Sequence, residues 1–193
     1  PMLPEKLPAQ KALLVKRFDR EAGQKIHMED MAQVYRLYAS DKYDKVSYGN
    51  ILGLLTAATK SDNALKLIRQ IVFSALIGNA DLHLKNISLI YRDGVSASLS
   101  PAYDLVSTIV YLNDHKMALN LHHTKKMDDY TLALFKKAAS KAGLPEMSVL
   151  TVVKETVEKT VTFFPEVLKL QLLDKNTAII IEKQIKRIAQ YLL

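Results

Sequence analysis

Cysteine is absent from this 193-residue chain. Its absence excludes disulfides, thiolate metal sites and cysteine nucleophiles, and it fits a reducing compartment. The chain also lacks any apolar run near the roughly 18 residues that a membrane-spanning helix needs. Residues 1–10 are polar and proline-rich and show no signal-peptide pattern. We therefore expect a cytoplasmic protein with no membrane partner.

Hydrophobic residues make up 49% of the chain and charged residues 24%, which is ordinary for a globular protein. The length suits a single domain, 1–193, or one large lobe of a two-lobed protein. The net charge of +7 is compatible with binding to nucleic acid or to another polyanion, nucleotide phosphate included. However, the lysines are spread along the chain, which favours solvated helix faces over a dedicated nucleic-acid surface.

The hydrophobic pattern predicts a mainly α-helical body with a small β-hairpin. Strands are expected at 12–18, 87–91 and 95–99, with a hairpin turn at 92–94 and a further short strand at 117–121. Helices are expected at 26–37, 51–59, 64–76, 128–142, 145–164 and 177–193. Residues 1–12 are expected to be flexible, and 128–193 to form a helical tail.

The stretch from Gly78 to Asn86 begins where a buried helix should stop and ends where a strand should begin. Loops held between rigid elements commonly carry catalytic groups. Asp81 and Asn86 have the spacing of protein-kinase catalytic loops, in which the Asp orients the substrate hydroxyl and the Asn holds Mg²⁺. The predicted hairpin then separates Asn86 from a second acid, Asp104.

One carboxylate and one amide oxygen, together with phosphate oxygens and water, suffice to hold Mg²⁺. A purely structural alternative stays open at this point. Asp81 could cap a turn, Asn86 could satisfy backbone groups, and Asp104 could cap a helix.

Two segments resemble a known family. Residues 77–88 are similar to the catalytic-loop signature of the HipA-family kinases, which are toxins of bacterial toxin–antitoxin modules, and 99–108 resemble that family's metal-binding segment. Two weaker matches extend the resemblance. Residues 14–20 resemble the family's hinge segment, so a hinge strand is expected at 13–20, and residues 27–33 resemble the start of the family's next helix. The resemblance runs from about residue 13 to residue 122, and the helical tail also suits the family.

The resemblance implies roles for individual residues. Asp81 would be the catalytic acid, and Asn86 and Asp104 would bind Mg²⁺. His83 and Lys85 would lie close to the ATP phosphates, although His83 could instead stabilise the turn and Lys85 could be a solvated lysine. The main chain at Lys16 and Phe18 would contact adenine, although Phe18 could equally belong to the core.

The sequence also departs from the family pattern. No residues before 13 could supply the N-terminal lobe with its phosphate-covering loop, and the segment 42–49 lacks the family's double glycine. We therefore expect the C-terminal lobe of a protein-kinase-like α+β fold with the N-lobe missing. The chain would be a fragment or one piece of a split kinase.

The resemblance implies an ATP- and Mg²⁺-dependent serine/threonine kinase lobe that phosphorylates a protein such as an aminoacyl-tRNA synthetase. The implied partners are the N-terminal lobe and a HipB-like helix-turn-helix antitoxin, with DNA reached only through the antitoxin. The alternative is a catalytically incompetent module that binds an antitoxin or a substrate. Direct DNA binding is a third hypothesis, but no helix-turn-helix signature stands out.

Overall fold

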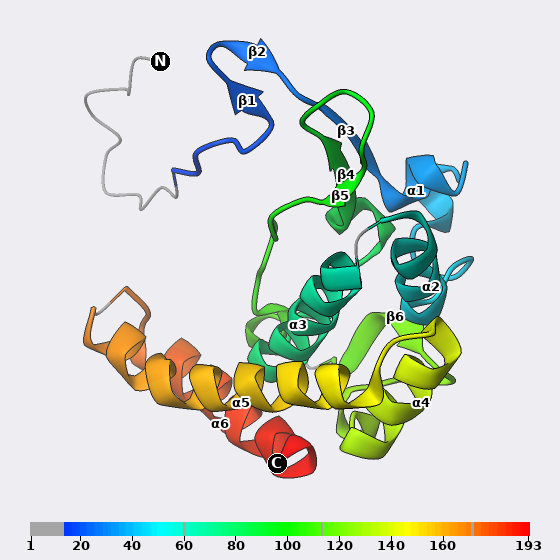
Figure 1. Ribbon diagram of the computed structural model, residues 1–193. Helices are drawn as coiled ribbons and strands as arrows, with labels where there is room; N and C mark the ends of the chain where they lie inside the picture. The colour runs from blue at the N-terminus through cyan, green and yellow to red at the C-terminus, as the bar shows by residue number, and fades with distance from the viewer. Residues whose placement is uncertain (1–13, 60, 113, 171) are drawn as a thin grey trace, which may run out of the picture.

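The computed structural model describes residues 14–59, 61–112, 114–170 and 172–193 (Figure 1). Within these ranges the fold is mixed α/β. The helices gather around the central helix α3, Ser61–Ile77, and three small antiparallel sheets lie at their edges. No helix in the described ranges is long and apolar enough to cross a membrane.

The helix α3, Ser61–Ile77, is the centre of the packing. The sequence IVFSALI at its end has almost no polar face, and Ile71, Val72 and Leu76 are fully buried. Around it lie α2 (Tyr48–Ala58), α5 (Glu146–Lys169) and α6 (Lys175–Leu192), and α4 (Leu132–Ala142) packs on α2 and α5. The predicted helices over 51–59, 64–76, 145–164 and 177–193 are therefore confirmed.

A three-stranded sheet covers one end of this body. β3 (His27–Asp30) pairs antiparallel with β4 (Ser88–Tyr91), and β4 pairs with β5 (Ser98–Leu99). Two further two-stranded sheets join β1 (Arg20–Glu21) to β2 (Gln24–Lys25), and β6 (Lys116–Leu121) to β7 (Thr124–Lys126). The expected hairpin is present, but β5 is shorter than the predicted strand at 95–99.

Two predictions near the N-terminus are wrong. Residues 14–18, the described part of the predicted strand at 12–18, contain no strand; the expected flexible segment 1–12 lies outside the described residues. The predicted helix at 26–37 is instead β3 followed by the one-turn helix α1, Met31–Val34. Pairing with β4 overrides the helical spacing, and α1 starts only after Asp30, which caps it through a reciprocal hydrogen-bond pair with Gln33.

The C-terminal helices differ from their predicted bounds for local reasons. The predicted helix at 128–142 begins with the 3₁₀ turn Met127–Asp129, and α4 proper starts after Thr131, whose side chain accepts the N–H of Leu134. Gly143 ends α4 at φ 68°, as expected. α5 continues through Pro165 to Lys169, beyond the predicted end at 164.

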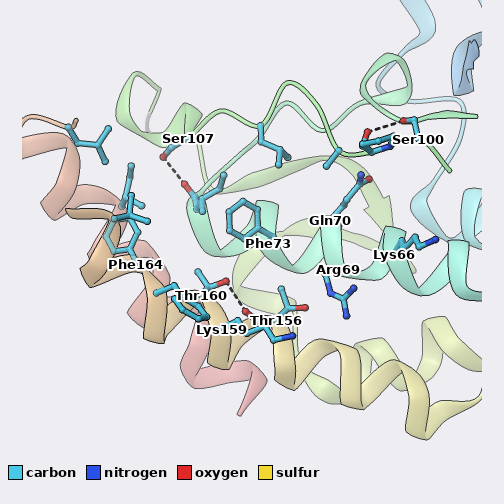
Figure 2. A pocket seen from close by; sticks show the side chains of 18 residues that line it. Lys66, Arg69, Gln70, Phe73, Ser100, Ser107, Thr156, Lys159, Thr160 and Phe164 are labelled. Atoms are coloured by element: carbon cyan, nitrogen blue, oxygen red, sulfur yellow. Dashed lines mark hydrogen bonds between the residues drawn. The ribbon is translucent and has the colours of Figure 1, made fainter. Parts of the chain in front are cut away.

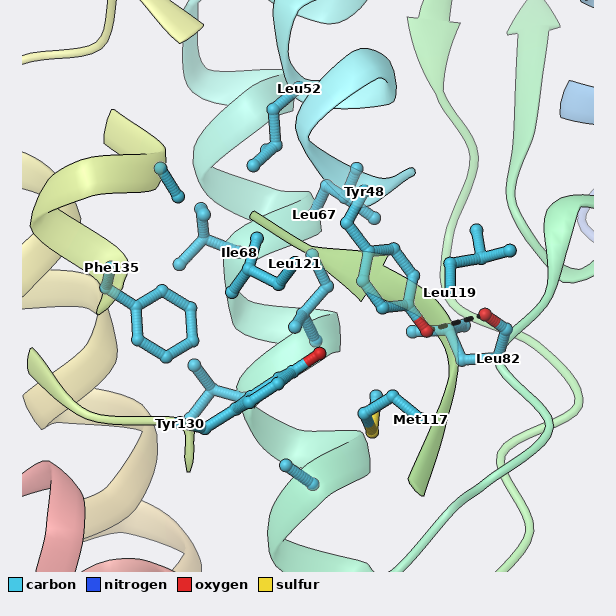
Figure 3. Packing of buried hydrophobic residues seen from close by; sticks show 14 of the residues in the cluster. Tyr48, Leu52, Leu67, Ile68, Leu82, Met117, Leu119, Leu121, Tyr130 and Phe135 are labelled. Atoms are coloured by element: carbon cyan, nitrogen blue, oxygen red, sulfur yellow. Dashed lines mark hydrogen bonds between the residues drawn. The ribbon is translucent and has the colours of Figure 1, made fainter. Parts of the chain in front are cut away.

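The interior joins α2, α3, α4 and β6 into one core (Figure 3). Tyr48 of α2 and Tyr130, which precedes α4, are both fully buried, and the Tyr130 ring meets the Phe135 ring edge-on at 5.9 Å. The hydroxyl of Tyr48 donates to the carbonyl of Leu82 at 2.7 Å. This buried hydrogen bond ties the core directly to the loop that carries Asp81.

Candidate active site

The loop after α3 is fixed by a second segment, 107–109. Ser107 donates its hydroxyl to the Ile77 carbonyl at 2.6 Å, and the Ile109 N–H donates to the Gly78 carbonyl at 3.1 Å. The Thr108 hydroxyl donates to the Gly78 carbonyl at 3.1 Å and accepts the Ala80 N–H at 2.8 Å. The start of the loop is therefore held on both sides, by its own helix and by the 3₁₀ turn η3, Thr108–Val110.

Asp81, His83 and Asn86 face one another because the loop folds back on itself. The carbonyl of Asp81 accepts both the His83 N–H at 2.8 Å and the Asn86 side-chain Nδ2 at 2.9 Å. Asn86 closes the 3₁₀ turn η2, Leu84–Asn86, and its N–H donates to the His83 carbonyl at 2.9 Å. Its Nδ2 is therefore committed, whereas its Oδ1 has no hydrogen bond within the described parts of the chain.

The carboxylate of Asp81 is the accessible acid of this loop, with its side chain 46% exposed. Its Oδ1 accepts the Tyr43 hydroxyl at 2.8 Å and lies 3.9 Å from His83 Nε2. Its Oδ2 receives no hydrogen bond from any described residue. Asp81 therefore presents one anchored oxygen and one open oxygen, which is the arrangement that a proton acceptor for an incoming hydroxyl needs.

His83 is buried beside this carboxylate, and the Tyr43 ring meets it edge-on at 5.2 Å. Burial lowers the pKa of His83; the Asp81 carboxylate opposes this shift, and the nearby Lys42 ammonium reinforces it. The imidazole is therefore kept in the neutral form more than a solvated histidine would be. Its Nδ1 is buried without a hydrogen-bond partner among the described residues.

Asp104 is brought to the same region by its neighbour Tyr103. The Tyr103 hydroxyl donates to the Lys85 carbonyl at 2.7 Å and lies 2.6 Å from the Ser88 hydroxyl, on either side of Asn86 in the sequence. The negative charge of Asp104 favours the protonated form of His83 and so partly opposes the lowering of its pKa by burial. Asp104 has φ 54°, a conformation uncommon for a residue with a side chain and frequent at functional sites.

Asn86 and Asp104 carry an amide oxygen and a carboxylate, which are the kinds of ligand that magnesium prefers. Neither the Asn86 Oδ1 nor the exposed Asp104 carboxylate has a hydrogen bond to any residue that the structure describes. The described ranges contain no group of three or more His, Asp or Glu residues with the geometry to hold a metal. A site of one carboxylate and one amide oxygen, completed by phosphate and water, does not require such a group.

Three further predicted site residues lie elsewhere or in other contacts. Lys85 forms an ion pair with Asp30, with 2.9 Å between Nζ and Oδ2, and so points toward the N-terminus of α1. The Phe18 ring packs against the Tyr103 ring at 5.7 Å, which links the expected hinge to the Asp104 segment. Lys16 is exposed.

Sequence reasoning missed Tyr43, Lys42 and Tyr103 as parts of this site. Tyr43 and Lys42 lie about 40 residues before Asp81 in a segment noted only for its missing glycines, so no local pattern connected them. The Lys42 ammonium lies 4.8 Å from the centre of the Tyr43 ring, and its positive charge helps to lower the pKa of His83. Tyr103 was visible beside Asp104 but carried no distinct signal.

A separate groove of about 810 Å³ lies between α3 and α5 and borders the Asp104 segment (Figure 2). Phe73, Ala102 and Leu105 line it, whereas Tyr103 contacts the loop that carries Asp81. The basic side chains at its rim are Lys66, Arg69 and Lys159, each paired with a neighbouring acid. The segment 100–107 thus separates this groove from the candidate active site.

Similar proteins and a family model point to the HipA family. The family model described as “HipA-like C-terminal domain” matches residues 2–164. A Sinorhizobium fredii protein named “Putative kinase Y4dM” is 46% identical over 149 residues, covering 77% of this chain and 36% of that protein. A Haemophilus influenzae protein named “Putative kinase” is 35% identical over 111 residues, covering 52% of this chain and 32% of that protein.

Among solved structures, HipA of Shewanella oneidensis MR-1, in a complex with HipB and operator DNA, superposes with a TM-score of 0.74. The identity is 22%, over 92% of this chain and 47% of that one, so the likeness concerns the fold. The chain spans about a third of the curated relatives and about half of the solved HipA chain.

Proposed function

Because the chain belongs to the HipA-like C-terminal domain family, we propose that it is the lobe of an ATP- and Mg²⁺-dependent serine/threonine protein kinase that carries the catalytic acid and the metal ligands. The main support is that one loop, and the segment docked against it through Tyr103, carry three side chains with oxygen atoms of the kinds that this mechanism needs. These are Asp81, Asn86 and Asp104. The names of the relatives point to the same class of enzyme.

The proposed roles follow from which atoms are free. Asp81 Oδ2 would accept the proton of the substrate hydroxyl while Oδ1 stays anchored to Tyr43. Asn86 Oδ1 and the Asp104 carboxylate would hold Mg²⁺, which when bound neutralises charge on the ATP phosphates. Neutral, buried His83 would donate or accept a hydrogen bond at the phosphate edge of the site.

The remaining parts of the proposal concern residues and partners outside this centre. Lys85 would have to leave Asp30 to reach phosphate, so we assign it a secondary role. The adenine ring would lie near Lys16 and Phe18, against the Tyr103 ring. The substrate would be a protein, such as an aminoacyl-tRNA synthetase, and the partner a HipB-like antitoxin, because HipA of S. oneidensis was solved with HipB and operator DNA.

Titration calorimetry with MgATP tests the metal ligands separately from the acid. The variants Asn86→Ala and Asp104→Asn should lose Mg²⁺-dependent ATP binding, whereas Asp81→Asn should keep it. A matched control is Glu158→Gln, which removes an exposed acid on α5, away from the loop. Equal MgATP binding by all four variants would refute the assignment of the metal ligands.

Phosphate transfer is then measured with the complementary N-terminal segment of the S. fredii relative added, following radiolabel into protein. Asp81→Asn should reduce transfer by at least about 100-fold, since positioned proton acceptors contribute roughly 10²- to 10⁴-fold. Transfer that does not depend on Asp81 would refute the kinase mechanism. MgATP binding without any transfer by the wild-type chain would favour the binding-module alternative.

A further inference from the structure

We propose that Tyr43 is a positioning residue that fixes the carboxylate of Asp81 for catalysis. The inference rests on the proposed kinase function, but it concerns a residue 38 positions away from Asp81 in the chain, in the loop before α2. The observation that carries it is the 2.8 Å hydrogen bond from the Tyr43 hydroxyl to Asp81 Oδ1. The bond is charge-assisted and joins two side chains that no local sequence pattern connects.

The hydroxyl of Tyr43 selects one of the two carboxylate oxygens. Asp81 follows the α3 terminus in a turn, and its side chain is 46% exposed, so packing alone does not fix its orientation. With Oδ1 bound to Tyr43, Oδ2 is the oxygen left open to an incoming alcohol. Without this bond the carboxylate could rotate, and the fraction of molecules with an oxygen aimed at the substrate would fall.

Tyr43 can hold Asp81 because it is itself held at several points. Its ring lies edge-on against buried His83, with 5.2 Å between the ring centres. The Lys125 ammonium of β7 donates to the Tyr43 carbonyl at 3.1 Å and to the Asp44 carboxylate at 3.0 Å. The main chain one residue earlier is also fixed, because the Lys42 carbonyl accepts the Leu84 N–H at 3.3 Å.

These contacts make the 42–44 segment a brace between β7 and the catalytic loop. Lys125 of β7 binds the Tyr43 carbonyl of the brace, and on the other side the brace contacts the loop through hydrogen bonds to Asp81 and Leu84. In the proposed mechanism neither Tyr43 nor Asp44 binds ATP or the substrate. Its effect on the reaction would therefore pass through Asp81, and it should change the rate of transfer rather than the affinity for nucleotide.

The test is Tyr43→Phe in the reconstituted transfer assay. Loss of a hydrogen bond to a charged group should lower kcat by roughly 10- to 100-fold. The KM for ATP and the calorimetric Kd for MgATP should stay within about two-fold, because Asn86 and Asp104 are untouched. Thermal unfolding should change little, since Tyr43 is only partly buried.

Tyr91→Phe is the matched control. Tyr91 also donates its hydroxyl to a carboxylate at 2.8 Å, that of Glu29, but in the β3–β4 sheet away from Asp81. It should leave kcat unchanged. Tyr43→Phe should also have no further effect in an Asp81→Asn background, because a residue that acts through Asp81 has nothing left to position there.

Each other outcome is decisive. An unchanged kcat in Tyr43→Phe would overturn the positioning role while leaving the kinase proposal intact, and a raised kcat would show that Tyr43 instead blocks the acid from its substrate. An additional loss in the Asp81→Asn background would assign Tyr43 a role that does not pass through Asp81. Absence of transfer by the wild-type protein would remove the kinase proposal first, and this inference with it.

Discussion

Replacement of Gly78 by alanine should destabilise the protein more than any other substitution of a glycine that ends a helix. Gly78 has φ 69° at the end of α3, where the loop that carries Asp81 begins. A Cβ atom there would lie 2.5 Å from Cγ2 and 2.9 Å from Cβ of Ile109, and 3.3 Å from Cγ of Gln184. The first two distances are far below normal contact. The neighbours belong to η3 and to α6, and α6 packs on both α3 and η3.

The magnitude has two parts. The left-handed backbone costs a residue with a side chain about 1–2 kcal/mol. Forcing a methyl group against a packed side chain costs typically about 1–3 kcal/mol more. The total of roughly 2–5 kcal/mol is a large part of the ~5–15 kcal/mol that holds an ordinary domain folded.

Gly143 provides the matched control, because it has φ 68° at the end of α4 and a Cβ there would meet nothing within 4 Å. Gly143→Ala should therefore pay only the backbone cost. The difference between the two variants isolates the steric cost at Gly78 and should appear in urea unfolding as ~1–3 kcal/mol. In a chain of this length it should lower Tm by a further ~2–12 °C. If Gly78→Ala proved no less stable than Gly143→Ala, the close contact between α3 and Ile109 would be refuted.

Two other predictions concern stability. Tyr48→Phe should destabilise the protein by about 1–3 kcal/mol in urea unfolding, because the Leu82 carbonyl loses a buried donor. Tyr130→Phe is the control and should change the stability little, because the equally buried Tyr130 hydroxyl has no hydrogen-bond partner among the described residues (Figure 3). Equal losses would contradict this assignment. Hydrogen bonds from Ser96 and from the Val95 and Ser96 N–H groups lower the pKa of Asp93 from 3.8 to about 2. Because the pKa of Asp93 is lower in the folded protein, its ionised carboxylate stabilises the fold fully above about pH 4, and this stabilisation is lost as the pH falls through about 2. NMR titration of the Asp93 carboxyl should show the lowered pKa in the wild-type protein and a higher pKa in Ser96→Ala.

The sequence predicted those features that depend on neighbouring residues. The long apolar run of α3, the stop at Gly78 and Asn79, and the turn between β4 and β5 are all local, and all are present. The C-terminal helices were also predicted, because apolar residues at helical spacing mark a buried face over many turns. Two predictions failed: the strand at 12–18, of which the described residues 14–18 contain none, and the helix over 26–30. The segment 27–30 is a strand because it pairs with β4, 58 to 64 residues later.

The candidate site also has a part that the sequence predicted and a part that only the fold revealed. The chain order and residue types of Asp81, Asn86 and Asp104 were visible in the sequence, as was the resemblance to the HipA family. Their roles as acid and metal ligands stay predictions until the binding and transfer experiments are done. The contacts that arrange them, from Tyr43 to Asp81 and from Tyr103 to Lys85, came only from the fold.

The sequence by itself determined which chemical groups are present, which segments are helical, and where the central helix must end, because these depend on composition and on spacing within a few residues. Only the tertiary structure decided which oxygen of Asp81 is held by Tyr43, that Lys85 pairs with Asp30, and that Gly78 has no room for a methyl group. Those outcomes require residues 31 to 106 positions apart in the sequence to meet, and such contacts depend on how the helices and sheets pack together.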